Sequence, residues 1–229
     1  MKIDLIDSNP ADKVERPKKD RFIGSFYDAD EVNALLQASK GTKLEMPILF
    51  GSFYGLRRSE VIGLKWDAID FEHDTITIRH TVTSCDIDGK RVLVAADTTK
   101  TKSSLRTLPL VPFVRERLLA LKEEQKENRR LCGRSYNREY MDYVCVNEIG
   151  DLIKPHYVTE SFPKLLKASG MRQIRFHDLR HPYVKHTTKK YRPRINLGRY
   201  FSAFIQDLPN YSRTTNHSLQ CYLKYIHRI

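Results

Sequence analysis

From residue 28 onward the chain first shows the apolar spacing of amphipathic helices. After an acidic turn that begins at Asp28, the apolar residues Val32, Leu35 and Leu36 recur at positions i, i+3 and i+4. This spacing predicts a helix that ends near Gly41, with its acidic side chains at the positive end of the helix dipole. The same spacing predicts two more helices, at residues 44–53 and 58–64.

The apolar residues then change from helical spacing to alternation. Residues 75–82 alternate polar and apolar side chains, Asp88 and Gly89 are typical of a tight hairpin turn, and residues 91–94 supply the returning strand. Residues 105–110 predict a third strand. The sequence therefore predicts a small three-stranded antiparallel sheet.

Helical spacing returns after the strands. An apolar stripe behind Pro112 predicts a helix to about Lys126, a second helix is expected over residues 158–168 before Gly170, and a further one begins at Phe176. Helices, an inserted antiparallel sheet and then more helices give an α+β order, and no βαβ unit repeats. The expected fold class is α+β, a mostly helical domain with one small sheet.

The charge of the chain favours a polyanionic partner. Its 229 residues include 40 Lys and Arg against 28 Asp and Glu, for a formal net charge of +12. Nucleic acid is a better match to this charge than an acidic membrane surface. Residues 182–229 carry nine of the basic residues and a single acid, Asp207. This asymmetry fits either a DNA-facing segment or a segment that forms no helical core.

Composition divides the chain into three parts. Residues 1–25 hold two X-Pro turn signals and a charge cluster and are predicted to be an interdomain linker. Residues 26–181 hold the predicted helices and strands and form the expected core domain. Residues 182–229 form an atypical basic C-terminal segment.

The sequence contains neither a long apolar run nor an N-terminal signal sequence, so the expected location is the cytoplasm. The cysteines lie far apart with no Cys-x-x-Cys pair, which argues against a disulfide framework or a zinc ribbon. They are predicted to be reduced packing residues: Cys85, Cys132, Cys145 and Cys221.

Two basic sites have the character of anion ligands. Arg57 follows the helix stop at Gly55 and begins a new helix, where its charge opposes the helix dipole unless an anion or carboxylate lies nearby. Arg57 is therefore either an anion ligand or a surface arginine paired with Glu60. Residues 98–104 form a polar, basic loop that is either a phosphate contact or an ordinary solvated loop.

A third cluster combines imidazole and guanidinium groups. On a helix, His177, Arg180 and His181 occupy positions i, i+3 and i+4 and share one face. The two histidines also suggest a zinc site, but Asp178 points off their face and supplies neither a third ligand nor a general base. The cluster is therefore interpreted as an anion and proton-transfer site without a metal.

In this order the motifs GLRRSEVIGLKWDAID, TKTKSSLRTLPL and FHDLRH resemble the catalytic domain of the tyrosine recombinases, the phage integrase family. The resemblance covers residues 28–181, and NPADKVERPKK resembles the linker that follows a DNA core-binding domain, which is expected upstream. It implies a tyrosine-recombinase-like fold and a transesterification on double-stranded DNA that uses no metal, no cofactor and no ATP. It also implies a homotetramer on DNA and accessory DNA-bending proteins as partners.

The resemblance also implies roles for individual residues. Arg57 and Arg180 match the two arginines that hold the non-bridging oxygens of the scissile phosphate. His177 matches the histidine that assists proton transfer, Glu60 the acid that supports the site, and His181 a companion of the second arginine.

The general acid and the nucleophile lie in the remaining motifs. Lys100 matches the lysine that protonates the leaving 5′-oxygen, and Lys102 is a near alternative because the loop register is open. Tyr225, followed by Ile-His, matches the tyrosine that forms a 3′-phosphotyrosyl bond, with His217 at the family's second histidine or tryptophan position. Tyr211 has a more usual separation from the second arginine but lacks the preceding motif, and it is the alternative nucleophile.

The C-terminal segment departs from the family pattern, which keeps other functions open. Pro182 interrupts the expected helix, and the abrupt change in charge there fits a degenerate tail, as from a shifted reading frame. The chain would then be a DNA-binding remnant with no positioned nucleophile. A type IB topoisomerase shares the chemistry but would act without a defined site, and the chain shows no clamp-like extra domain.

Overall fold

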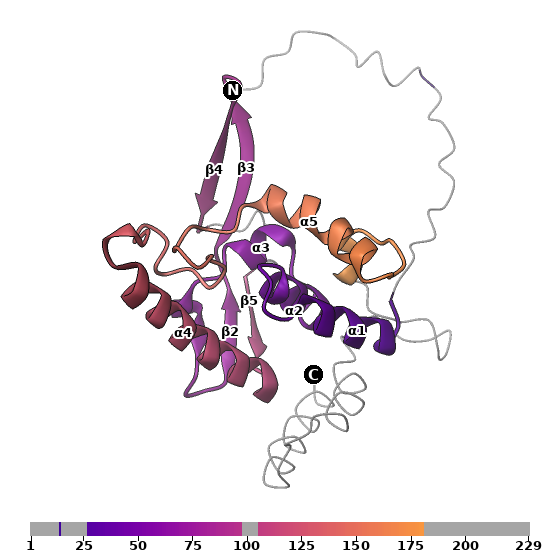
Figure 1. The fold of residues 1–229 in the computed structure, drawn as a ribbon, viewed down its shortest axis with the longest axis horizontal. Helices are drawn as coiled ribbons and strands as arrows, with labels where there is room; N and C mark the ends of the chain where they lie inside the picture. The colour runs from indigo at the N-terminus through magenta and orange to yellow at the C-terminus, as the bar shows by residue number, and fades with distance from the viewer. Residues whose placement is uncertain (1–13, 15–26, 98–104, 181–229) are drawn as a thin grey trace, which may run out of the picture.

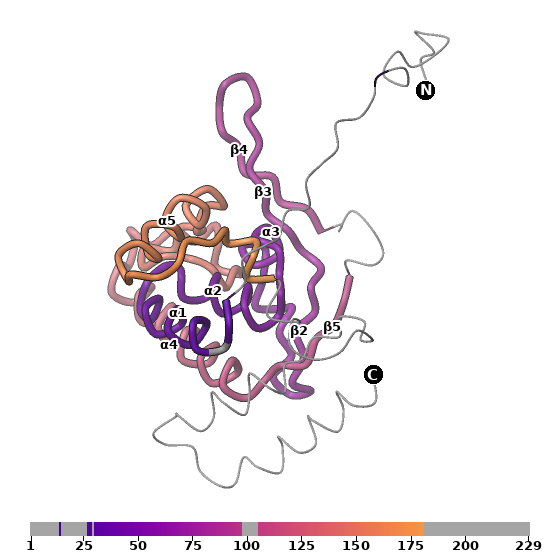
Figure 2. Tube along the Cα trace, turned by 90° about the vertical axis from the view of Figure 1, so that its right-hand side faces the viewer, coloured from indigo at the N-terminus to yellow at the C-terminus, as the bar shows by residue number. Residues whose placement is uncertain are grey.

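The computed structural model describes residues 14, 27–97 and 105–180, and the fold is an α+β arrangement. Helices α1, α2, α3 and α5 gather beside two small antiparallel sheets, α4 lies along one of these sheets, and one hairpin projects from the body (Figures 1 and 2). The helices are α1 (Ala29–Ser39), α2 (Glu45–Phe53), α3 (Arg58–Ile62), α4 (Pro112–Cys132) and α5 (Pro155–Ala168). The strands are β1 (Ile69–Asp70), β2 (Thr75–Ile78), β3 (Thr81–Ile87), β4 (Lys90–Ala96) and β5 (Arg106–Pro109). Short 3-10 helices are η2 (Trp66–Ala68), η4 (Gly133–Ser135) and η5 (Phe176–Arg180).

The first helix forms where its sequence predicts it. The Asp28 carboxylate accepts from the backbone N–H of Glu31 at 2.8 Å, and the Glu31 carboxylate accepts from the backbone N–H of Asp28 at 2.9 Å. This reciprocal pair is a capping box, which satisfies two N–H groups that a helix start leaves open. It fixes α1 at the acidic turn, and Leu35 is fully buried on its inner face.

The predicted sheet is divided differently in the structure. The alternating run at residues 75–82 splits, because β2 pairs with β1 and β5 while β3 pairs only with β4. The break falls at buried His80, where Nδ1 lies 2.5 Å from an Asp97 carboxylate oxygen and Nε2 lies 2.9 Å from the Tyr143 hydroxyl. A Cβ at Gly63 would lie 2.6 Å from Cα of Thr81, so the end of α3 packs closely on the chain at this break. The three-stranded antiparallel sheet is therefore β1-β2-β5, and the Asp88–Gly89 hairpin is a separate sheet.

The hydrophobic core lies between the helices, and the last described segment, η5, packs against it. Phe162 of α5 and Phe176 of η5 meet edge to face, with ring centroids 5.6 Å apart. A Cβ at Gly51 in α2 would lie 3.2 Å from the Phe176 ring, so η5 packs closely on α2. This packing brings the end of the described chain onto the loop that follows α2.

Two further expectations differ from the structure in detail. Helix α4 continues beyond the predicted end to Cys132, because its later turns carry ion pairs such as Glu127 with Arg130 in place of an apolar stripe. Cys145 is buried as a packing residue, but Cys85 is exposed on the hairpin, so the packing role is wrong for Cys85. Across the described ranges, no helix is long and apolar enough to span a bilayer.

Candidate active site

The site forms at the loop between α2 and α3. Gly55 ends α2 with φ +59°, a left-handed conformation that glycine adopts without strain, and the chain then turns so that Arg57 becomes the N-cap of α3. From η5, Arg180 Nε donates to the carbonyl oxygen of Gly55 at 2.7 Å. Two arginines that lie far apart in the sequence therefore share one loop.

Buried Glu60 organises the first of these arginines. Its side chain is only 2% exposed, and its Oε1 accepts from Arg57 Nη1 at 2.8 Å. Its Oε2 accepts from the backbone N–H of Arg57 at 2.7 Å. The Arg57 side chain nevertheless remains 51% exposed. The structure therefore confirms the pairing of Arg57 with Glu60, and the exposed part of the side chain leaves the role of anion ligand as a prediction.

A third arginine completes the cluster: Arg106, which stands in the TKTKSSLRTLPL motif but was assigned no role from it. Arg106 Nη1 lies 3.2 Å from Glu60 Oε1, and Arg106 Nη2 lies 2.9 Å from Glu60 Oε2, so the guanidinium faces the carboxylate as a fork. Arg106 stands opposite Ile78, which is 1% exposed, in the β2–β5 ladder. Strand alternation places Arg106 on the same side as Leu108 and buried Leu110, and a charge at such an inward position was the available signal.

The electrostatics of the cluster are dominated by positive charge. Burial favours a raised pKa for Glu60, but the hydrogen bonds from Arg106 and Arg57 outweigh it and hold the pKa below its usual range. Burial lowers the pKa of Arg180, the charges of Arg57 and Arg106 lower it further, and the charge of Glu60 opposes this. Two guanidinium groups thus contact one carboxylate, and a third, that of Arg180, lies close enough to be affected by their charges.

The FHDLRH segment forms a 3-10 helix, not the start of an α-helix, within the described residues. A 3-10 helix has three residues per turn, so His177 and Arg180 at i and i+3 lie on the same face. His177 is exposed, whereas Asp178 is buried and accepts from Arg175 Nη2 at 2.7 Å. Asp178 therefore points away from that face, as the sequence predicted, and anchors η5.

Several predicted site residues lie outside the described residues. They are Lys100, Lys102, His181, Tyr211, His217 and Tyr225, and also Cys221 among the predicted packing cysteines. The structure brings together Arg57, Glu60 and Arg180, with His177 on the same short helix as Arg180. In the described part of the chain, no group of three or more His, Cys, Asp or Glu side chains is placed to hold a metal ion.

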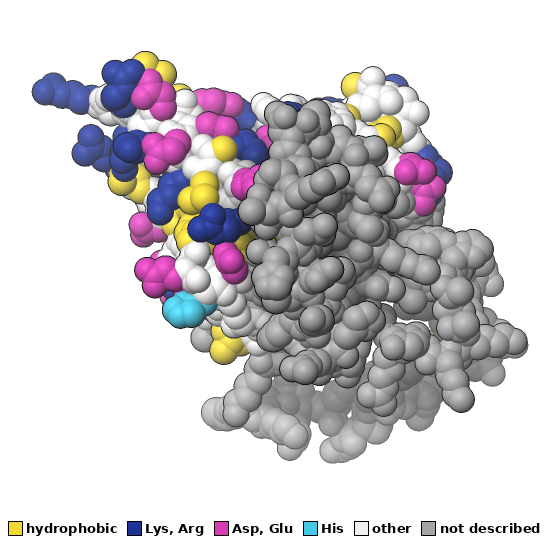
Figure 3. All heavy atoms as spheres, turned by 90° about the horizontal axis from the view of Figure 1, so that it is seen from below, with side chains coloured by type: hydrophobic (Ala, Val, Ile, Leu, Met, Phe, Trp, Pro, Cys, Tyr) yellow, Lys and Arg dark blue, Asp and Glu magenta, His cyan; other side chains and the backbone are white. Residues whose placement is uncertain are grey.

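One face of the described surface carries charges of both signs. In Figure 3, Lys and Arg side chains lie among Asp and Glu side chains over the coloured part of this face. Ion pairs along α4 include Lys126 with Glu123 and Arg117 with Glu124. On α4, unlike around Glu60, carboxylates therefore offset the basic side chains.

Comparison with known proteins identifies the family. The chain matches the phage integrase family model over residues 25–191. It is 31% identical over 189 residues to the tyrosine recombinase XerC-like protein of Caldanaerobacter subterraneus subsp. tengcongensis, covering 79% of this chain and 46% of that protein. It is 26% identical over 199 residues to prophage integrase IntR of Escherichia coli K12, covering 79% and 44% respectively. The chain belongs to the phage integrase family of tyrosine recombinases and spans about half the length of these curated relatives.

The fold agrees with this family. A structure of the Tn1549 transposon integrase in complex with a circular intermediate DNA superposes with a TM-score of 0.55 at 16% identity, over 76% of this chain and 55% of that chain. The described residues thus have the α+β fold of tyrosine recombinase catalytic domains.

Proposed function

We propose that this chain is the catalytic domain of a site-specific DNA recombinase or integrase that cleaves and rejoins DNA through a 3′-phosphotyrosyl intermediate. The observation that carries the proposal is the meeting of Arg57 and Arg180 at Gly55, with Glu60 buried behind Arg57. Two fork-shaped, permanently charged donors at one point are suited to the non-bridging oxygens of a phosphodiester.

The chemistry assigned to this site is a transesterification. The tyrosine oxygen, with Tyr225 preferred over Tyr211, attacks the phosphorus and forms a phosphotyrosyl bond, and the bond from phosphorus to the 5′-oxygen breaks. The tyrosine gives up its proton, and the leaving 5′-oxygen receives one from Lys100 or its neighbour Lys102. Rejoining reverses both steps, so the bond energy is retained and no ATP is consumed.

The described residues contribute stabilisation of the transition state. Negative charge builds on the non-bridging oxygens as the pentacoordinate phosphorus forms, and Arg57 and Arg180 are already held in place by Glu60 and the Gly55 carbonyl. Exposed His177 lies on the face of η5 that also carries Arg180, where an imidazole can assist proton transfer. His181 and His217 are assigned supporting roles from the family motifs.

The proposed partners are double-stranded DNA, three further copies of the chain in a homotetramer, and accessory DNA-bending proteins. The proposed location is the cytoplasm. In this organisation residues 1–25 form the linker from a DNA core-binding domain, residues 26–181 form the catalytic core, and residues 182–229 carry the nucleophile.

A nicked duplex that carries the ends of the mobile element tests the proposal. Cleavage near the nick releases a short fragment, so the covalent protein–DNA adduct is trapped and resolves as a shifted band on a denaturing gel. We expect a band with the unaltered chain and with Tyr211→Phe, and no band with Tyr225→Phe. Loss only in Tyr211→Phe would keep the enzyme and reverse the choice of nucleophile.

The second candidate function is a DNA-binding remnant without a positioned nucleophile. The change in charge at residue 182 favours it, because a segment with nine basic residues and one acid carries little of the apolar pattern of a packed helix. A remnant would bind DNA with steep salt dependence through counterion release and would form no adduct on any nicked substrate.

A further inference from the structure

Arg106 is the member of the cluster to which neither the motifs nor the proposed chemistry assigns a task. Its side chain is 27% exposed and comes from β5, whereas Arg57 and Glu60 come from the loop and helix after α2. It therefore reaches Glu60 from a different layer of the fold. A bidentate contact between distant elements constrains geometry more tightly than a local i,i+3 pair does.

Arg57 and Arg106 together occupy the hydrogen-bonding positions of the Glu60 carboxylate. An ionised carboxylate offers about four lone-pair positions. Oε1 accepts from Arg57 Nη1 and from Arg106 Nη1, and Oε2 accepts from the Arg57 backbone N–H and from Arg106 Nη2. In the described contacts, Arg57 therefore gives Glu60 one side-chain N–H, while Arg106 gives it two.

We infer that Arg106 is a positioning residue that acts through Glu60 to keep the guanidinium of Arg57 directed outward, toward the scissile phosphate. By occupying one side of the buried carboxylate, Arg106 prevents Glu60 from drawing Arg57 into a bidentate pair of its own. Without Arg106, the second Nη of Arg57 turns toward the vacated oxygen and is lost to the phosphate. The effect on cleavage rests on the proposed function, whereas the effect on the Arg57 side chain does not.

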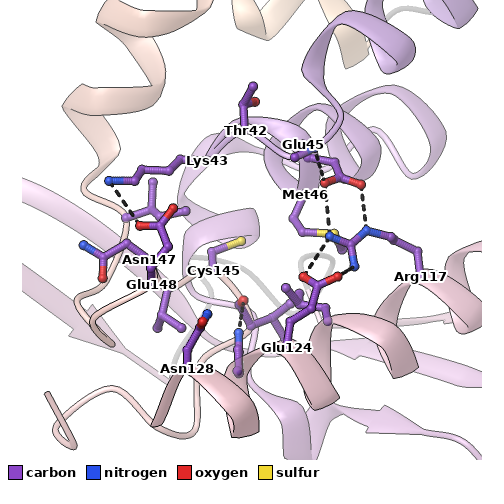
Figure 4. Close-up of a pocket in the computed structure, with 16 residues that line it drawn as sticks. Thr42, Lys43, Glu45, Met46, Arg117, Glu124, Asn128, Cys145, Asn147 and Glu148 are labelled. Atoms are coloured by element: carbon purple, nitrogen blue, oxygen red, sulfur yellow. Dashed lines mark hydrogen bonds and ion pairs between the residues drawn. The ribbon is translucent and has the colours of Figure 1, made fainter. Parts of the chain in front are cut away.

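The fold offers a matched control in Arg117 of α4 (Figure 4). Its side chain is 24% exposed, and its Nε and Nη2 contact the two carboxylate oxygens of Glu45 at 2.6 and 3.1 Å. Arg117 is thus an arginine of similar burial in a similar bidentate pair. Its other partner is a second carboxylate, that of Glu124, whereas Arg106 shares its carboxylate with a second arginine. Replacing Arg117 disturbs packing and an ion pair to a comparable degree, and no residue of the Glu60 cluster contacts it in the described structure.

The test compares Arg106→Met and Arg117→Met in the full chain, with single-turnover cleavage of a nicked duplex bound in advance. We expect Arg106→Met to slow cleavage by about 10- to 100-fold while DNA affinity changes by less than about threefold, because the lost interaction acts mainly in the transition state. Arg117→Met is expected to cleave within about twofold of the unaltered chain. Arg106→Lys, which restores one charged donor to Glu60 but not the fork, is expected to recover part of the rate.

A double-variant cycle establishes that Arg106 acts through Glu60. In a Glu60→Gln background the carboxylate that competes for Arg57 is gone, so adding Arg106→Met is expected to cost less than about threefold more. An equal loss in both backgrounds would show that Arg106 acts directly and would overturn the inference. Undiminished cleavage by Arg106→Met would overturn it as well.

A readout that needs no cleavage separates this inference from the proposed function. The side-chain ¹⁵N resonances of Arg57, assigned with Arg57→Lys, report how fast its guanidinium rotates. We expect the rotation to slow by about tenfold in Arg106→Met, because a further charge-assisted hydrogen bond must break. Unchanged rotation would contradict the inference even if cleavage fell. If the unaltered chain forms no adduct, the proposed function fails while this measurement still decides the role of Arg106.

Discussion

The molecule contains two ion-pair clusters with opposite balances of charge. Around Glu60, one buried carboxylate lies between Arg57 and Arg106, with Arg180 close enough to alter the balance further. Around Arg117, one guanidinium lies between Glu45 and Glu124 (Figure 4). The first cluster has guanidinium groups in excess, whereas the second has carboxylates in excess.

The two clusters also shift the pKa values of their arginines in opposite directions. The hydrogen bonds that Arg117 donates to Glu45 and Glu124 raise its pKa, so its neighbours favour its positive charge. Burial together with the charges of Arg57 and Arg106 lowers the pKa of Arg180. A positive group whose charge is disfavoured by its surroundings gains most when an anion arrives. We therefore expect an anion to bind at the first cluster, whereas the ion pair of the second joins α4 to the start of α2.

Removing an arginine from each cluster gives the largest expected difference. Arg180→Met should slow single-turnover DNA cleavage by about 10²- to 10³-fold, as loss of one donor to a transition-state oxyanion does. Arg117→Met should leave the rate nearly unchanged. Equal losses in the two variants, measured on DNA bound in advance, would remove the functional distinction between the clusters.

Removing a carboxylate from each cluster tests how much each cluster contributes to the free energy of unfolding. Glu60→Gln should lower the free energy of unfolding by about 3 kcal/mol, because it breaks a buried pair and leaves guanidinium groups without their counter-charge. Glu124→Gln, at a position that is 52% exposed, should cost less than about 1 kcal/mol. Urea unfolding of both variants measures the two values, and a larger loss in Glu124→Gln would contradict the assignment.

The pH dependence of stability should identify Glu60 as the titrating group. Burial raises its pKa, but hydrogen bonds from Arg106 and Arg57 lower it more, so the folded pKa lies below the unfolded value of about 4.3. Its stabilisation is therefore present above about pH 4.3 and is lost as pH falls through the folded pKa. The difference in unfolding free energy between the unaltered chain and Glu60→Gln should shrink over that range. In Arg106→Met the loss should begin at higher pH, and a loss at the same pH would show that Arg106 does not hold this carboxylate.

The smallest effect is expected from the turn that carries the site. Gly55→Ala and Gly170→Ala both place a Cβ on a residue with φ near +60°, so each should cost about 1 kcal/mol of stability. Only Gly55→Ala should also reduce cleavage, by a few-fold, because its carbonyl holds Arg180. Reduced cleavage in Gly170→Ala would show that the rate follows general stability and not the geometry of the turn.

Local patterns predicted the helices well and the strand pairing less well. The acidic turn at Asp28 and the apolar spacing behind it set α1, and α2, α3 and α5 also form where helical spacing predicts them. The alternation over residues 75–82 did not reveal its break, which lies where Gly63 packs on Thr81 and where His80 meets Asp97. Strand pairing is a property of distant segments, which alternation in one segment does not specify.

The candidate site could be predicted only in part, because one of its contacts also joins distant segments. Arg57, Glu60, His177 and Arg180 stand in motifs of fixed spacing, so the family resemblance marked them directly. Arg106 stands in the TKTKSSLRTLPL motif too, but the resemblance gave it no role, and only the fold shows the carboxylate that it meets. An inward charge on a strand is the physical signal for such a residue, since a buried charge requires a partner.

Covalent trapping on a nicked duplex shows whether the positive cluster around Glu60 serves DNA cleavage, with the unaltered chain, Arg180→Met and Arg117→Met run side by side on a denaturing gel. We expect an adduct with the unaltered chain and with Arg117→Met, and a nearly complete loss of adduct with Arg180→Met. Stable, salt-sensitive DNA binding by the unaltered chain without any adduct would contradict this expectation. A full yield of adduct from Arg180→Met would also contradict it, since the cleavage would then not depend on the positive cluster around Glu60.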